Sequence, residues 1–209
     1  IHLGDQRLNR RARRLLAKLG DKPTVSIPAA CGGWGETRAA YRLFDHPQVS
    51  AERVLAPLIA CTETRLRAHP RVLCIQDTTE LDYTTKKGIA DLGPLNYESR
   101  WGLYLHPTLA VTPERVPLGL LDLHCWAREP GSLGQEKDAN RALEDKESVR
   151  LVDGFARVNE LAERLTETRL TDIADRAGAP NGLLAEAPRP EHGPHGLVRV
   201  QHRARRLAA

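Results

Sequence analysis

The chain has 209 residues, of which 41% are hydrophobic and 28% charged, so it can bury one core and a small second domain. Its formal charge of +4 is compatible with a polyanionic partner but does not identify one. No run of about 18 apolar residues occurs, and no charged segment followed by an apolar one opens the chain, which argues against a membrane-spanning helix and a secretory leader. We therefore expect a cytoplasmic protein with no membrane partner. The four cysteines form no Cys-x-x-Cys pair, so buried reduced thiols are expected in place of a zinc or dithiol site.

The first predicted helix is basic. Apolar residues recur at helical spacing from Leu8 to Leu19, which predicts an amphipathic helix that begins at an Asp5 N-cap and stops at Gly20. The basic residues between them are Arg7, Arg10, Arg11, Arg13, Arg14 and Lys18. Like charges repel unless an anion neutralises them, so this stretch favours a phosphate backbone as partner. A solvated helix face is the open alternative.

Two more helices complete the N-terminal part. One is expected over Trp34–Phe44 after a turn at Pro28–Gly33, and one from near Ser50 to before Pro70. Residues 1–70 are therefore predicted to form a helical module.

The periodicity then changes to that of strands. The apolar run Val72–Ile75 predicts a buried strand that ends in Gln76-Asp77-Thr78-Thr79. Two further strands, Leu105–Val111 and Leu118–Trp126, are joined by Thr112–Arg115, whose proline favours a hairpin.

A helix and a fourth strand follow an exposed charged loop. The helix is expected to carry an apolar side, and the strand Arg169–Ala174 ends at Asp175. Members of the apolar side are Val149, Val152, Phe155, Ala156, Leu161 and Leu165. After Ala177, Gly and Pro interrupt the pattern, and only a short helix at Leu183–Ala187 and a strand at Leu197–Val200 are expected.

This order of elements is that of the first half of an RNase H-like α/β unit, in which the first and fourth strands are neighbours. Asp77 and Asp175 would then face each other at one edge of the sheet. Carboxylate oxygens are preferred ligands of Mg²⁺ and Mn²⁺, and two shared carboxylates can hold a metal pair for phosphodiester chemistry. Alternatively, Asp77 caps the turn at Thr78 and Thr79, and Asp175 is the N-cap of a following helix.

Many ordered segments resemble the DDE transposases of the insertion-sequence-four family, the group that includes the transposon-five transposase. The matching segments are Leu3-Gly4-Asp5 with Arg7 and Leu8, Ser26-Ile27-Pro28, Ala30-Cys31-Gly32, Ala40-Tyr41-Arg42, Gln76-Asp77-Thr78-Thr79, Leu105-His106-Pro107-Thr108, Pro117-Leu118-Gly119-Leu120, Trp126 with Arg128, Lys146-Glu147-Ser148 and Asp175-Arg176. The resemblance runs from Leu3 to about Arg176 and, more loosely, through Glu186.

The resemblance implies roles for particular residues. Asp77 and Asp175 would be the first and second acids of the catalytic triad, with Mg²⁺ or Mn²⁺ as the metal. The segment up to about Pro70 would grip transposon ends, which are double-stranded DNA. Candidate DNA contacts are Arg7, Arg10, Arg11 and Arg42. Arginine suits this role because its planar fork meets phosphate or guanine in a bidentate manner.

The chain also departs from the family pattern. Asp175-Arg176 is followed by Ala177-Gly178-Ala179-Pro180, where the family has further acids, and Leu151 replaces a bulky aromatic. The third acid of the family lies far beyond the second, whereas this chain ends at Ala209, and neither Glu186 nor Glu191 has the expected context.

We therefore expect an α/β protein with a helical DNA-binding module at 1–70, an incomplete RNase H-like catalytic domain at 71–187 and an irregular basic tail at 188–209. The expected function is that of a cut-and-paste DNA transposase, truncated and weakly active or inactive, so that enzymatic activity stays open. The alternatives are a DNA-binding fragment that inhibits or pairs with a full-length transposase, and a decayed coding sequence. The isolated chain is expected to be a monomer.

Three smaller sequence features can each be explained in two ways. Trp34, Tyr41 and Trp126 could stack on splayed bases, but core or helix-docking positions are favoured. The Lys146-Glu147-Ser148 motif is explained equally well by helix capping. The tail histidines His192, His195 and His202 are read as coincidental, because Gly and Pro around them give no rigid frame for a metal.

Overall fold

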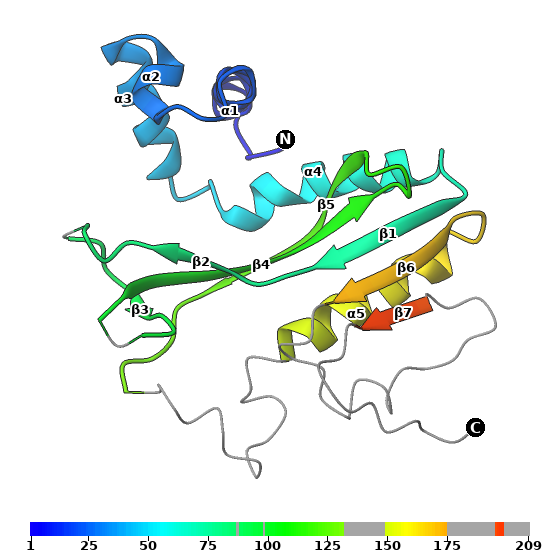
Figure 1. Cartoon of the computed structure of the whole chain (residues 1–209). Coiled ribbons are helices and arrows are strands. Elements are labelled where there is room, and N and C mark those ends of the chain that lie inside the picture. The colour runs from blue at the N-terminus through cyan, green and yellow to red at the C-terminus, as the bar shows by residue number, and fades with distance from the viewer. Residues whose placement is uncertain (87, 98, 132–148, 175–194, 199–209) are drawn as a thin grey trace. The chain divides into compact units, whose positions relative to one another are not determined.

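The computed structural model describes residues 1–86, 88–97, 99–131, 149–174 and 195–198, the last segment as backbone only (Figure 1). The chain divides into two compact units, Ile1–Ala60 and Cys61–Ala209. The division falls inside α4 (Ala51–Leu66), ahead of the boundary at residue 70 that the sequence favours. No helix in the described part is long and apolar enough to cross a bilayer.

The first unit contains three helices before α4: α1 (Gln6–Asp21), α2 (Ile27–Cys31) and α3 (Trp34–Phe44). The predicted N-cap is confirmed, because the Asp5 side chain accepts a hydrogen bond from the backbone N–H of Arg7 at 2.6 Å. The predicted stop at Gly20 is wrong. Gly20 is helical, and α1 ends at Asp21, where the N–H of Lys22 bonds back to the carbonyl oxygen of Leu19.

The core of the first unit lies where α1 meets α2 and α3. Leu8, Ala12 and Leu15 form the buried stripe of α1, and they pack with residues of the other two helices. The residues that they meet are Leu3, Cys31, Ala40 and Leu43. The segment predicted as a turn at Pro28–Gly33 is mostly helix α2, whose C-cap Gly32 lies in the left-handed region with φ 73°.

The second unit is built on a mixed sheet. Its elements are β1 (Arg71–Gln76), β2 (Thr79–Asp82), β3 (Gly93–Pro94), β4 (Trp101–Val111), β5 (Pro117–Trp126), α5 (Val149–Arg164), β6 (Arg169–Ala174) and β7 (His195–Val198). β4 lies antiparallel to both β1 and β5, while β6 lies parallel to β1 and β7 parallel to β6. The predicted adjacency of the first and fourth strands is therefore confirmed.

The predicted strands are found, and some are longer than expected. β4 begins at Trp101, because its first residues pair with the short strands β2 and β3, which the sequence analysis missed. The predicted hairpin joins β4 to β5, with Arg115 in the left-handed region at φ 68°. The predicted strand at Leu197–Val200 overlaps β7, and its last two residues lie outside the described part, as does the helix predicted at Leu183–Ala187.

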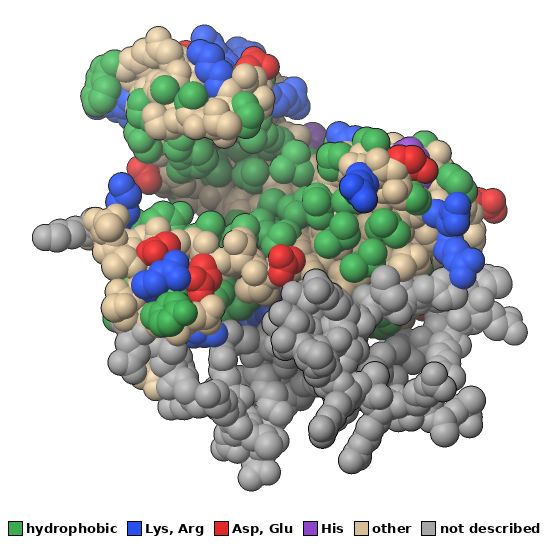
Figure 2. Space-filling view, viewed as in Figure 1, with side chains coloured by type: hydrophobic (Ala, Val, Ile, Leu, Met, Phe, Trp, Pro, Cys, Tyr) green, Lys and Arg blue, Asp and Glu red, His purple; other side chains and the backbone are tan. Residues whose placement is uncertain are grey.

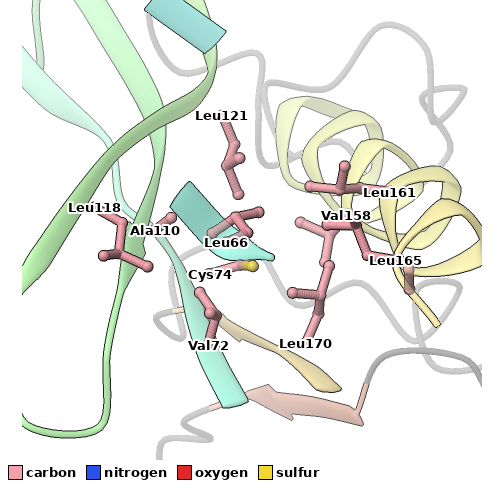
Figure 3. Close-up of a cluster of buried hydrophobic side chains, with 11 residues drawn as sticks. Leu66, Val72, Cys74, Ala110, Leu118, Leu121, Val158, Leu161, Leu165 and Leu170 are labelled. Carbon is pink, nitrogen blue, oxygen red and sulfur yellow. The ribbon is translucent and has the colours of Figure 1, made fainter. Parts of the chain in front are cut away.

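The main core of the second unit lies between α5 and one face of the sheet (Figure 3). Val158, Leu161 and Leu165 of α5 point toward this core, which Val72 and Cys74 of β1 enter from the sheet. Its other members are Leu66, Ala110, Leu118, Leu121, Ala162 and Leu170. Residues at helical spacing on α5 therefore bury one continuous stripe.

Two details of burial correct the sequence-based expectations. Ala156, expected on the apolar side of α5, is exposed, and the stripe instead passes through Leu151 and Val158. All four cysteines are free, but Cys61 and Cys125 are exposed, so the expectation of buried thiols holds only for the other two.

Candidate nucleic-acid interface and carboxylate site

The predicted DNA-contacting arginines of α1 lie on its solvent side. Arg7, Arg10 and Arg11 are exposed, while the interleaved Leu8 and Ala12 are buried. Figure 2 shows Lys and Arg side chains gathered on the helical unit. The 3.6-residue period of the helix therefore separates a basic face from the apolar stripe that anchors it.

A groove between α1 and α3 brings the basic side chains together. It is lined by Arg7, Arg10, Arg11, Arg14, Leu15, Cys31, Glu36, Ala39 and Ala40. Arg42 is exposed on α3 but is not among these lining residues. The structure thus brings three of the four predicted contacts to one groove and leaves the fourth apart from it.

Ion pairs neutralise some of these arginines. Arg14 pairs with Glu36 at 3.1 Å, and Arg7 pairs with Asp5 at 3.1 Å. The hydrogen bond and charge of Asp5 raise the pKa of Arg7, and those of Arg7 lower the pKa of Asp5. No ion pair joins Arg10 or Arg11 to any residue in the described part. Their charge is thus available to a polyanion, although contact with DNA stays a prediction.

The outer face of α3 adds two aromatic rings. Trp34 is 78% exposed and Tyr41 is 47% exposed, so the core half of the expectation of core or helix-docking positions is wrong for these two rings. The helix instead buries Thr37, Ala40 and Leu43. Arg38, which the sequence analysis did not single out, is also exposed and lies four residues after Trp34 and three before Tyr41, on the same side of the helix. Exposed aromatic and guanidinium groups are the elements of a stacking surface for bases.

Asp77 follows the last residue of β1 and is exposed. Its Oδ1 accepts a hydrogen bond from the backbone N–H of Thr78 at 2.8 Å, which agrees with the turn-capping alternative. The same carboxylate can still offer Oδ2 to a cation, so capping and metal binding are compatible.

Asp175 lies outside the described residues, as do Lys146-Glu147-Ser148, His192 and His202, and the side chain of His195 is not described. The strand that precedes Asp175 is nevertheless in place. Gln76 of β1 and Ala174 of β6 are register partners in parallel strands, and Asp77 and Asp175 are the next residue of each strand. Within the described part, no three His, Cys, Asp or Glu side chains gather closely enough to hold a metal ion.

A buried polar cluster lies behind Asp77. Gln76, His106 and Asp172 have relative exposures of 2%, 4% and 1%, and hydrogen bonds join them. Burial raises the pKa of Asp172 to about 6, against a smaller lowering by the hydrogen bond from Gln76. Burial and nearby His124 lower the pKa of His106, so its neutral form is favoured.

Trp126 belongs to a stack on the second unit. Its ring lies 5.4 Å from that of Tyr104, with Arg128 over Tyr104 at 4.5 Å and Arg150 over Trp126 at 5.6 Å. The two arginines cover both outer faces of the ring pair, which agrees with the packing role favoured for Trp126.

Residues 1–49 match the sequence model of the family described as transposase DNA-binding. The matched segment contains α1, α2 and α3, and thus the arginine groove and the exposed rings of α3. The match supports a transposase-related DNA-binding role, with DNA as partner.

Proposed function

We propose that this chain is a cut-and-paste DNA transposase of the DDE type, related to the insertion-sequence-four family. It binds double-stranded DNA through α1 and α3 and carries a divalent-metal site at the ends of β1 and β6. The observation that carries the catalytic half is the parallel register of Gln76 with Ala174, because it makes Asp77 and Asp175 the next residues of two adjacent strands.

The sheet supports an RNase H-like catalytic domain. Its central strand β1 has the antiparallel strands β4 and β5 on one side and the parallel strands β6 and β7 on the other. Helix α5 connects β5 to β6 and covers one face. The adjacency of β1 and β6 is the one that the sequence-based interpretation requires.

The donor set suits Mg²⁺ or Mn²⁺ better than a softer metal. Asp77 offers an exposed carboxylate, and Asp175 adds a second in sequence. A bound metal pair would activate the attacking oxygen and stabilise the leaving oxygen of a phosphodiester. Because the residues that match the family supply two of its three acids, we expect weak metal binding and slow cleavage by this chain alone.

The test combines metal binding and nicking by the full chain. We expect calorimetric Mn²⁺ binding and Mn²⁺-dependent nicking of duplex DNA, both lost in Asp77→Asn. The matched control is Asp91→Asn, an exposed aspartate at φ 59°, a conformation that asparagine tolerates. Equal nicking by wild type and Asp77→Asn would overturn the enzymatic half of the proposal.

A second candidate is a DNA-binding inhibitor of a full-length transposase. It is favoured by the arginine groove, because every residue that lines it lies within residues 1–49, the segment that matches the transposase DNA-binding family model. The observation that would select it is salt-sensitive binding of duplex DNA without any metal-dependent nicking. Binding that does not weaken as salt rises would contradict both candidates.

A further inference from the structure

We propose that a buried hydrogen-bond chain, Asp172–Gln76–His106–Thr78, sets the position of Asp77 relative to the end of β6, so that Gln76, His106 and Thr78 are positioning residues for the metal site. The inference rests on the proposed function, because it concerns the same carboxylates. Gln76, His106 and Thr78 bind neither metal nor DNA in the proposed function, and the inference gives each of them a positioning role.

The chain is continuous from β6 to the residue after Asp77. Gln76 Nε2 donates to Asp172 Oδ1 at 2.8 Å, and Gln76 Oε1 lies 3.1 Å from His106 Nε2. His106 Nδ1 lies 2.7 Å from the hydroxyl oxygen of Thr78. One run of side chains therefore links β6, β1 and β4 and returns to the segment that carries Asp77.

The orientation of the Gln76 amide sets the direction of every bond. Gln76 Nε2 donates to the Asp172 oxygen, so Gln76 Oε1 faces His106 and accepts a hydrogen bond from Nε2–H. Neutral His106 then has an unprotonated Nδ1, which accepts a hydrogen bond from the hydroxyl group of Thr78. All three bonds point toward Asp172, and each one fixes the orientation of the next group.

The chain is enclosed on the side of α5. A Cβ atom added to Gly154 would collide with the amide oxygen of Gln76, so a larger residue there would displace that side chain from its hydrogen bonds. A polar group buried without a partner is costly, which holds Gln76 in the one orientation that satisfies both neighbours.

Side-chain hydrogen bonds hold the chain at Asp77 and Thr78, because the backbone hydrogen bonds between strands are interrupted there. Gln76 pairs with Thr108, and Thr79 pairs with Leu105, so the register of β1 continues unchanged into β2. The two intervening residues, Asp77 and Thr78, fall opposite Pro107 and His106 in that register. Proline has no amide hydrogen and cannot donate a ladder bond, so the strand opens at Asp77.

Asp77 thus stands between two anchored neighbours. Gln76 is tied to β6 through Asp172, and Thr78 is tied to β4 through His106. Because β6 leads directly into Asp175, the same ties fix the spacing of the two strand ends that the proposed function assigns to the metal. Residues that orient metal ligands in this way typically change affinity about 10-fold to 100-fold when removed.

The test is a calorimetric Mn²⁺ titration of the full chain, of two variants at Thr78, the exposed end of the network, and of one control variant outside it. Thr78→Val removes the hydroxyl with little change of shape, and Thr78→Ser restores it. Thr84→Val is the matched control, because its hydroxyl bonds to Asp82 outside the network. We expect binding to weaken about tenfold in Thr78→Val and to stay near the wild-type value in Thr78→Ser and Thr84→Val.

The outcomes separate this inference from the proposed function. Wild-type binding that survives Thr78→Val would overturn the inference and leave the metal site standing, and an equal loss in Thr84→Val would also overturn it. No Mn²⁺ binding by wild type would overturn the metal site and the inference together. The ¹⁵N NMR spectrum of His106 is a readout that needs no metal. In the wild type we expect a protonated Nε2 and an unprotonated Nδ1 whose chemical shift reports the hydrogen bond from Thr78. In Thr78→Val that hydrogen-bond shift should disappear. The opposite tautomer would overturn the inference.

Discussion

The two units place their polar residues in opposite ways. On the first unit the distinctive groups are exposed: Arg10 and Arg11 project from α1, and Trp34 projects from α3. On the second unit Gln76 and Asp172 are almost fully buried. One unit thus presents charge to a partner, while the other uses buried polar groups to hold its strand ends.

The difference matters for how each unit tolerates change. Removal of a solvated arginine changes the free energy of unfolding little, because water replaces the contacts of its side chain. A buried amide cannot be replaced by water, so its partners lose their hydrogen bonds outright. We therefore expect substitutions on the first unit to change binding and substitutions in the buried chain to change stability.

The largest effect is expected for Gln76→Leu. It leaves both Asp172 and the Nε2–H of His106 without their partner, and each buried unpaired group costs about 1–3 kcal/mol. Chemical denaturation should show a loss of about 2–5 kcal/mol in the free energy of unfolding. The exposed Gln48→Leu is the control and should change stability by less than about 0.5 kcal/mol. Equal effects of the two variants would contradict the structural role of the buried chain.

Gly154→Ala should destabilise the protein although alanine favours helix. The added methyl group collides with the Gln76 side chain, and overpacking of this kind costs about 1–3 kcal/mol. Gly20→Ala in α1 meets nothing within 4 Å and should stabilise by up to about 1 kcal/mol, so the two variants should differ in sign. Thermal melts of both variants measure the difference, and a stabilising Gly154→Ala would mean that Gln76 is not enclosed.

A smaller effect, confined to a pH window, is expected for Asp172→Asn. The ordinary carboxyl pKa is 3.8 and burial raises that of Asp172 to about 6, so the folded protein favours the neutral acid. Its contribution to stability is full below pH 3.8 and is lost as pH rises through about 6. The variant lacks this loss, so its stability relative to wild type should rise by at most about 3 kcal/mol over that window.

The difference between the two proteins is the quantity to measure, because His106 titrates in the opposite sense. Its lowered pKa means that the folded protein resists charging it, which removes stability as pH falls. Urea denaturation of both proteins from pH 4 to pH 7 provides the comparison. A constant difference across that range would contradict the raised pKa of the buried Asp172.

The position of Asp77 could be predicted because an apolar run that ends in a carboxylate is a local signal. The pairing of β1 with β6 was predicted from the order of helices and strands along the chain. The buried chain was missed because its partners come from distant strands. A signal was present: Gln76 and Asp172 occupy inward positions of alternating strands whose other inward residues are apolar, such as Cys74. The exposure of Trp34 was missed because it depends on which side of α3 faces the core. Ala40 and Leu43 of that side are buried by tertiary packing with α1, and the sequence of α3 alone does not specify this packing.

The smallest stability effect and the clearest binding effect are expected at Arg10 and Arg11. Both are exposed and have no ion pair within the described part, so Arg10→Ala and Arg11→Ala should each change the free energy of unfolding by less than about 0.5 kcal/mol. If each contacts one phosphate, the slope of log affinity against log salt should fall by about 1 per variant. Anisotropy titrations of labelled duplex DNA at several salt concentrations measure this slope, with the exposed Arg67→Ala of the second unit as control. If the slope is unchanged in Arg10→Ala and Arg11→Ala, the DNA interface does not lie at the α1 groove. If the slope falls and the free energy of unfolding also falls by a large amount, the basic face of α1 contributes to the stability of the fold as well as to DNA binding.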